Sequence, residues 1–240
     1  MQPSQGPPQS PKKSNEQTKV AWDTQAGDWV YKDDKRDAIP APLFEEFYQK
    51  HRAQFKDALD IGCGTGKFLI PMAQDGLQVT GVEFSSKRKE ATEANLERAG
   101  LKGKTRIMEG DSKDLVAIKS ESIDWIFSKG AIHHNTWAGI QKSFQEATRV
   151  LRPGGFFLFQ GRSTKDAALG RSELILDTRG STARGVKFGQ PGVIEHYFTE
   201  QELRDLASEN GLKIVLGPQE INHSKLEDPK MRWWVVYRKI

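Results

Sequence analysis

Short apolar runs alternate with helical patterns from about residue 57 to the end of the chain. Such runs, bounded by polar and glycine-containing segments, predict strands. The five that come first are Ala58–Ile61, Gln78–Val82, Thr105–Met108, Ile123–Ser128 and Gly155–Gln160. Strands that alternate with helices are typical of a parallel sheet covered on both faces. Two later runs, Leu212–Leu216 and Trp233–Tyr237, bring the expected total to about seven strands.

We therefore expect an α/β fold with a Rossmann-like, doubly wound sheet, mostly parallel, with one antiparallel strand near the C-terminus. The clearest helix follows Thr136, where apolar residues recur at three- and four-residue spacing and Arg152–Gly155 ends the pattern. A second helix is predicted at Thr199, because Thr199 and Glu202 form a capping-box pattern and Asn210-Gly211 is a stop signal.

The chain is predicted to be one domain with two attachments. Residues 1–20 are rich in Pro, Gln, Ser and Lys and are expected to be a disordered tail. A single domain then covers residues 21–240, which is enough chain for one sizeable core. Residues 21–55 form an arm containing Trp22 and Trp29, which either packs beside the sheet or closes over a ligand. The long connection at about 162–197 is expected to be a lid, since such insertions are commonly functional.

Composition restricts the function only slightly. The net charge of +4 permits an acidic substrate or RNA and argues for neither. No apolar run reaches the roughly 20 residues that span a bilayer, and no leader segment is recognisable, so we expect a cytoplasmic protein without a membrane partner. Cys63 is the single cysteine, which excludes an internal disulfide, and no metal-ligand spacing is evident. The oligomeric state is not readable from the sequence.

A glycine loop, Asp60–Gly66, follows the first predicted strand. A glycine-rich turn between strand and helix lets the backbone approach a ligand and directs helix N-terminal amides at it. The NAD fingerprint would place a third glycine where Lys67 stands, so the spacing favours another nucleotide. Glu83 ends the second strand, where a carboxylate can accept hydrogen bonds from ribose hydroxyls. Asp111 follows the third strand and is either an acceptor for an adenine edge or a helix N-cap.

Five segments in sequence order, ALDIGCGTGKF, TGVEFS, EGDSKDL, IDWIFSKGAIHHN and RVLRPGGFFLF, resemble the motif series of class I S-adenosylmethionine (SAM) dependent methyltransferases. The resemblance covers roughly Ala58 to Gln160. It implies SAM as cofactor, S-adenosylhomocysteine as product, and no metal. The cofactor residues that it implies are Asp60, Gly62, Cys63, Gly64, Gly66, Glu83, Phe84, Asp111, Ser112, Ser128 and Lys129. Asp60 would hold the methionine part, Glu83 the ribose and Asp111 the adenine, while Ser128 and Lys129 would line the cofactor through their backbone.

The methyl acceptor is the least defined part of the sequence interpretation. His133 and His134 follow the fourth strand and are the candidate catalytic bases, since histidine titrates in the useful range. The alternative is that they cap the next helix or hydrogen-bond within the fold. The arm and lid supply the candidate substrate-binding residues, which are Tyr31, Arg179, Arg184, His196 and Tyr197.

Four functions remain open at this stage. The first is methyl transfer to a small-molecule acceptor, in keeping with a compact chain that has no extra domain to hold a macromolecule. The second is RNA methylation, because Ile132–His134 and His196–Phe198 faintly resemble enzymes that methylate wobble uridines of tRNA. The third is a SAM-binding protein without activity, and the fourth is an NAD(P) oxidoreductase.

Overall fold

The computed structural model describes residues 19–20, 22–24, 30, 39–171, 173–175, 182–185, 193–224 and 228–240, with the backbone alone described for 171, 173–175 and 182–185. Tyr31 and Arg179 lie outside these residues, as do residues 1–18 of the expected tail. The side chain of Arg184 lies outside them as well.

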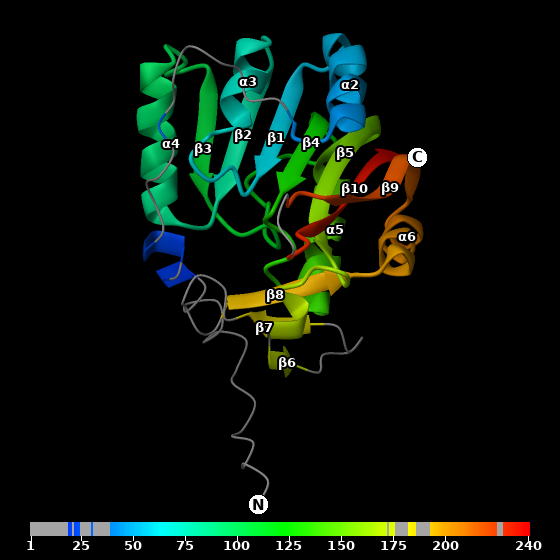
Figure 1. The fold of residues 1–240 in the computed structure, drawn as a ribbon. Helices are drawn as coiled ribbons and strands as arrows, with labels where there is room; N and C mark the ends of the chain where they lie inside the picture. Colours follow the sequence, from blue (N-terminus) through cyan, green and yellow to red (C-terminus); the bar gives the residue numbers. More distant parts are fainter. Residues whose placement is uncertain are drawn as a thin grey trace, which may run out of the picture.

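The described part of the chain alternates helices and strands in the expected order (Figure 1). The α-helices are α2 (Pro42–His51), α3 (Leu69–Gln74), α4 (Ser86–Arg98), α5 (Trp137–Val150) and α6 (Glu200–Glu209), and two 3₁₀ turns are η1 (Arg52–Gln54) and η2 (Leu169–Arg171). The strands are β1 (Asp57–Ile61), β2 (Gln78–Glu83), β3 (Thr105–Glu109), β4 (Ile123–Lys129), β5 (Leu151–Ser163), β6 (Glu173–Ile175), β7 (Thr182–Gly185), β8 (Val193–Phe198), β9 (Leu212–Asn222) and β10 (Met231–Lys239).

The strands form one mixed sheet. Its hydrogen-bonded path runs β3-β2-β1-β4-β5-β8-β7-β6, and β10 and β9 branch from β5. Pairing is parallel from β3 to β5 and antiparallel between β10 and both β5 and β9. The Rossmann-like class and the antiparallel C-terminal strand are therefore confirmed. The expected count of seven is too low, because the path alone contains eight strands and the described residues ten.

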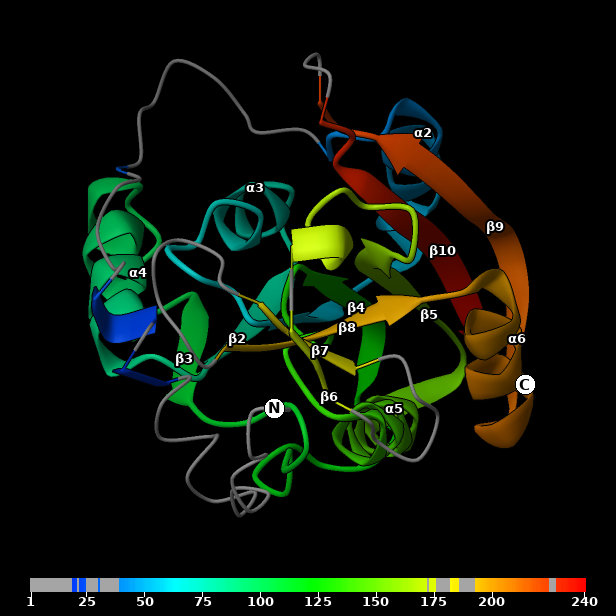
Figure 2. The same cartoon turned by 60° about the horizontal axis from the view of Figure 1, so that its bottom comes forward.

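The extra strands come from the segment that the sequence assigns to the lid. β5 continues to Ser163, and its last residues pair in parallel with β8 at Tyr197 and Phe198. β7 then pairs antiparallel with β8, and β6 with β7. Figure 2 shows these strands lying across the carboxyl ends of the central strands. The lid is thus a small sheet extension beside those ends. Two of its strands, β6 and β7, are only three and four residues long, whereas β8 carries the buried apolar residues Val193, Ile194, Tyr197 and Phe198.

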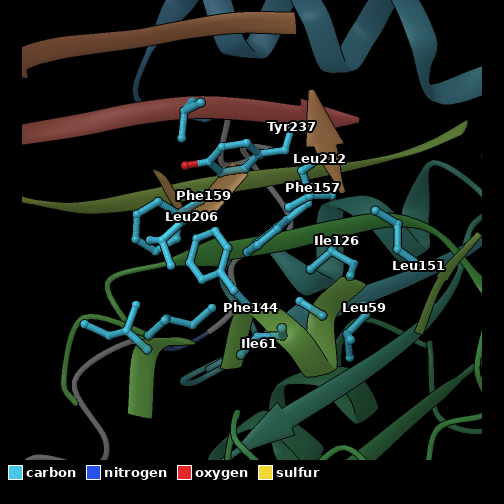
Figure 3. Close-up of a cluster of buried hydrophobic side chains, with 14 of the residues drawn as sticks. Leu59, Ile61, Ile126, Phe144, Leu151, Phe157, Phe159, Leu206, Leu212 and Tyr237 are labelled. Carbon is cyan, nitrogen blue, oxygen red and sulfur yellow. The ribbon is translucent and has the colours of Figure 1, made fainter. Parts of the chain in front are cut away.

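Helices cover both faces of the sheet, each over its own apolar core. On one face, α2, α3 and α4 pack on a cluster that includes Trp125, Phe127 and Trp234. On the other, α5 and α6 pack on a cluster centred on Phe144 and Phe157 (Figure 3). Alternate residues of each strand supply the two clusters, as the period of a β-strand requires.

The two predicted helix signals are confirmed. Thr136 caps α5 by accepting a hydrogen bond from the Gly139 amide. Thr199 and Glu202 form a complete capping box at the start of α6. Within the described residues, no helix is both long and apolar enough to cross a bilayer.

Phe144 offers a test of the α5 core. Its side chain is fully buried against Phe157, Phe159 and Tyr237. Phe144→Ala would leave a cavity that the neighbouring rings cannot close, so we expect the free energy of unfolding to fall by about 3–5 kcal/mol. The exposed Val116, changed to Ala, is the control and is expected to shift it by less than about 0.5 kcal/mol. Urea unfolding followed by circular dichroism measures both, and equal effects would contradict the packing described.

Candidate functional site

The glycine loop connects β1 to α3 and lies against the neighbouring strands. The amides of Gly62 and Cys63 donate to the Val82 carbonyl of β2 at 2.7 and 3.2 Å. Gly62 has a φ of +74°, and a Cβ at this position would stand 2.2 Å from the Cβ of Ala131. Only glycine satisfies both conditions. The loop therefore brings the ends of β1, β2 and β4 into contact around one opening.

Glu83 fixes this loop from the end of β2. Its Oε2 accepts a hydrogen bond from the Gly64 amide at 2.7 Å, and its Oε1 accepts one from the Ser85 amide at 3.0 Å. The carboxylate is 6% exposed, and burial raises its pKa while these two hydrogen bonds oppose the rise. Each carboxylate oxygen can accept more than one hydrogen bond. Glu83 can thus hold the loop and still bind ligand hydroxyls.

Helix α4 supports the same loop from behind. The Thr92 hydroxyl donates to the Gly64 carbonyl at 2.6 Å, and the Asn95 amide donates to the Thr65 carbonyl at 2.9 Å. Both side chains are buried on the inner face of α4. Thr92 and Asn95 are not among the site residues predicted from the sequence. Their signal is a pair of polar residues on the buried side of a helix, three positions apart.

A cavity of about 650 Å³, counting its open mouth, lies over the carboxyl ends of β1 to β4. Its lining comprises Trp22, Ile61, Gly62, Val82, Glu83, Phe84, Arg88, Gly110, Asp111, Ser112, Lys113, Gly130, Ala131, His134 and Asn135. The predicted ribose, adenine and base candidates thus share one cavity.

Asp111 and Ser112 form the end of the cavity beside β3. The Asp111 carboxylate accepts from the Lys113 amide at 3.0 Å and pairs with the Lys113 ammonium at 2.6 Å. The Ser112 hydroxyl shares a hydrogen bond with that of Ser143 at 2.8 Å. The aromatic ring of Phe84 lines the same cavity. Lys113 was not among the predicted site residues, although it lies two positions beyond Asp111.

The N-terminal arm closes this cavity. Residues 19–20 and 22–24 are helical, and Trp22 contributes to the lining. The guanidinium of Arg88 lies 4.6 Å from the Trp22 ring, and the Asp23 carboxylate accepts from the Ser85 hydroxyl at 2.6 Å. Contacts with α4 therefore hold the arm over the pocket. Within the described part of the arm, α2 packs beside the sheet and Trp22 lines the cavity, so each of the two alternatives describes one part of it.

Asp60, at the end of β1, is a buried carboxylate that does not line the cavity. It is 2% exposed, and no hydrogen bond or ion pair to it occurs among the described residues. Burial, with Glu83 nearby, raises its pKa to about 8, while Lys129 opposes the rise. An unpaired buried carboxylate costs free energy unless a positive group compensates it. Asp60 is thus suited to receive a cationic ligand group.

The structure separates the two adjacent histidines. His134 lines the cavity, with its ring 4.7 Å from that of Trp22 in an edge-on arrangement. His133 lies behind it, 3% exposed, outside the cavity lining. Burial lowers the pKa of His134 to about 4, and the positive charge of Arg162 adds to this effect, although Glu195 opposes it. His134 is therefore neutral near pH 7 and able to accept a proton.

A buried ionic network stands behind His134. Glu195 Oε1 lies 3.9 Å from His134 Nδ1 and 2.9 Å from the Arg162 guanidinium, and Glu195 Oε2 accepts from the Tyr197 hydroxyl at 2.9 Å. Arg162 also pairs with Asp166 at 3.2 Å, and Arg232 pairs with the same carboxylate. These charges are paired with one another, as buried charges must be. The network fixes the surroundings of His134.

Ligand atoms of His133, His134 and Glu195 lie within 4.8 Å of one another, which by distance alone would suit a metal ion. The Glu195 oxygen in this group already pairs with Arg162. A second cation would have to displace that guanidinium, so the donor set fits a metal poorly. The absence of a metal remains a prediction.

Four predicted residues lie in the core or behind the cavity. Cys63 is buried beside Gly81, and burial raises the pKa of its thiol. Ser128 is fully buried and its hydroxyl donates to the Ile61 carbonyl at 3.3 Å. His196 is fully buried 3.2 Å from Glu202, against the Trp137 ring, and Tyr197 belongs to the ionic network. Substrate contact by His196 or Tyr197 remains a prediction, as does contact by Tyr31, Arg179 and Arg184.

Comparison with known proteins gives a consistent family. Residues 59–159 match a family described as a methyltransferase domain. The chain is 30% identical over 163 residues to an uncharacterized methyltransferase of Geobacillus kaustophilus, covering 67% of this chain and 71% of that protein. It is 32% identical over 124 residues to a probable S-adenosylmethionine-dependent methyltransferase of Saccharomyces cerevisiae, covering 52% of this chain and 42% of the yeast protein. The chain thus spans about half or less of the length of some curated relatives.

Solved structures share the fold. A 1,6-didemethyltoxoflavin-N1-methyltransferase of Burkholderia thailandensis, solved with its acceptor and S-adenosylhomocysteine bound, superposes with a TM-score of 0.70 at 17% identity, covering 99% of this chain and 93% of that one. A SAM-dependent methyltransferase of Methanosarcina mazei gives 0.65 at 20% identity, covering 85% and 99%. Together with the domain match and the Geobacillus relative, these findings place the chain in the family of class I SAM-dependent methyltransferases.

Proposed function

We propose that the protein transfers the methyl group of SAM to a small-molecule acceptor, with His134 as the base where the acceptor must lose a proton. The observation that supports this most is the position of His134 in the same cavity as Glu83 and Asp111. A nucleoside held between Asp111 and Glu83 would extend toward Gly62 and Ala131. The His134 amide donates to the Ala131 carbonyl at 2.9 Å, next to Gly130 in the cavity lining.

In this proposal each part of the cofactor has a partner. Asp111 and Phe84 bind the adenine, and Glu83 binds the ribose hydroxyls. The amino group of the methionine part binds Asp60, whose buried carboxylate gains a compensating positive charge. SAM itself supplies the activated methyl on its sulfonium, and the protein supplies alignment and exclusion of water. Trp22 of the arm and Arg88 of α4 contribute to that exclusion, since both line the cavity and contact each other.

The elements that surround the cavity support a small-molecule acceptor. Trp22 of the arm contributes to the lining of the cavity, and the strands β6 to β8 lie across the carboxyl ends of the sheet (Figure 2). The Burkholderia neighbour is named as acting on a small molecule. A small acceptor can enter such a site whole, whereas a nucleotide of tRNA would have to be extruded into it.

The experiment that tests the proposal uses methyl-labelled SAM with two separate pools, the low-mass fraction of a cell extract and purified total RNA. We expect label in small molecules and none in RNA. Label confined to RNA would contradict the small-molecule proposal and favour the tRNA alternative. Binding of S-adenosylhomocysteine by titration calorimetry without labelling of either pool would favour a SAM-binding protein without activity.

Glu83→Gln tests the ribose contact. The substitution removes the negative charge that strengthens the hydrogen bonds, so we expect the Kd of S-adenosylhomocysteine to rise about tenfold or more. Since 5′-methylthioadenosine keeps the ribose, its Kd should rise equally. Glu93→Gln, at an exposed position of α4, is the control. Calorimetry that gives equal Kd values for the Glu83→Gln and Glu93→Gln proteins would exclude the assignment.

His134→Gln tests the base. We expect kcat to fall about 100-fold or more while the Kd of S-adenosylhomocysteine stays unchanged. His51→Gln, on helix α2, is the matched control. Because the pKa of His134 is about 4, kcat/KM of the wild type should stay level below pH 6.5 and decline only as the pH falls through about 4. Turnover by His134→Gln equal to that of His51→Gln would remove His134 from the mechanism.

A further inference from the structure

Beyond β4, on the side away from Asp111, three cationic side chains come together. They are Lys129 at the end of β4, Arg162 near the end of β5 and Arg232 at the start of β10, and we refer to them as the cationic cluster. Arg162 and Arg232 are partners in the β5–β10 register. Lys129 is the β4 partner of Gln160, which precedes Arg162 by two positions. Paired and alternate strand residues share a face, so the cluster lies on one face of the sheet.

The cluster has one positive charge more than its paired acids. Arg162 and Arg232 are neutralised by Asp166 and Glu195. Lys129 is half-buried, and its ammonium lies 5.2 Å from the centre of the Phe68 ring. No ion pair of Lys129 occurs within the described part of the chain. Asp60 is the acid whose charge raises the pKa of Lys129. Its own pKa is about 8, so it carries little charge near pH 7.

The pKa values of Lys129 and His223 reflect the closeness of these positive charges. Burial lowers the pKa of Lys129, and Lys67 and Arg232 add to the effect. The pKa of His223, which accepts a hydrogen bond from the Trp234 indole at 2.8 Å, is also lowered by burial and then by Arg232 and Lys129. Half-buried cations that repel one another are unfavourable without an anion. The cluster therefore lacks one negative charge.

The cluster adjoins the cofactor cavity along the chain at Lys129. Gly130 lines that cavity and follows Lys129 directly. A Cβ on Gly130 would have no atom nearer than 4.0 Å, the closest being Gln160 Oε1 and His133 Cε1. An acceptor standing over Gly130 would reach the transferable methyl at one end and the cationic cluster at the other.

We propose that Lys129, with Arg232 beside it, binds a carboxylate of the methyl acceptor, so that the substrate is a small organic acid. The inference rests on the proposed function. The surplus of one charge matches a carboxylate better than a phosphate, which carries close to two near neutral pH. Arg162 and Arg232 come from β5 and β10, beyond the strands that surround the adenosine part of the cavity. The cluster is therefore placed for the acceptor rather than for the nucleoside.

The first arm of the test changes the acceptor. The low-mass fraction of a cell extract is divided, and one half is treated with carbodiimide and methylamine, which convert carboxylates into neutral amides. Each half is incubated with the full-length protein and methyl-labelled SAM. We expect labelling of small molecules to fall about tenfold or more after capping, since a charge-assisted contact is lost. Labelling that survives capping overturns the inference and leaves the proposed function intact.

The second arm changes the protein. Lys129→Met keeps an aliphatic side chain of similar length and removes the charge, and Lys104→Met removes the same charge at an exposed position. We expect KM for the extract acceptor to rise about tenfold or more in Lys129→Met alone, with the Kd of S-adenosylhomocysteine unchanged. Arg232→Lys, which retains a charge to pair with Asp166, should raise KM less. Circular dichroism confirms that each variant is folded.

Two results of the second arm overturn the inference. One is an equal KM in the Lys129→Met and Lys104→Met proteins. The other is a weaker Kd for S-adenosylhomocysteine in Lys129→Met with an unchanged Kd for 5′-methylthioadenosine, which would assign Lys129 to the carboxylate of the cofactor. Absence of any labelled small molecule with the wild type, despite cofactor binding, contradicts the proposed function instead.

Discussion

The paired hydrogen bonds from the Gly64 and Ser85 amides to the Glu83 carboxylate are the interaction on which the site depends. They join the loop after β1 to the turn after β2, and so fix the relative position of the two backbone segments that border the cavity. Burial alone would favour a protonated Glu83, whereas the two amides favour the charged form. One side chain thus organises the loop and presents negative charge to a ligand.

Other charged side chains near the site are largely buried, one without a partner among the described residues and four paired with one another. Asp60 is buried without a partner, while Arg162, Arg232, Asp166 and Glu195 neutralise one another behind His134. Such a network costs desolvation free energy, and its value lies in the fixed geometry that it imposes. Burial keeps His134 neutral, and within the network Glu195 opposes this effect while Arg162 adds to it.

The sequence predicted the parallel core well because β1, β2, β4 and β5 are largely buried and read as apolar runs, whereas β3 at the end of the sheet is partly exposed. Glu83 and Asp111 were predictable because strand ends in this kind of sheet meet at one edge. The strands β6 and β7 were not, since three and four residues are too few to show such a pattern, and β8 was missed although Val193, Ile194, Tyr197 and Phe198 are buried. Which of His133 and His134 faces the cavity depends on the hydrogen bond from the His196 amide to the His133 carbonyl, a contact across 63 positions that no local pattern contains.

The most direct measurement is a crystal structure of the protein with S-adenosylhomocysteine and its labelled acceptor, once that acceptor is identified. The account predicts both ribose hydroxyls within hydrogen-bond distance of the Glu83 carboxylate, the adenine beside Asp111, and the sulfur facing the acceptor next to His134. A cofactor bound elsewhere, or an acceptor that meets the sulfur on a side away from His134, would contradict it.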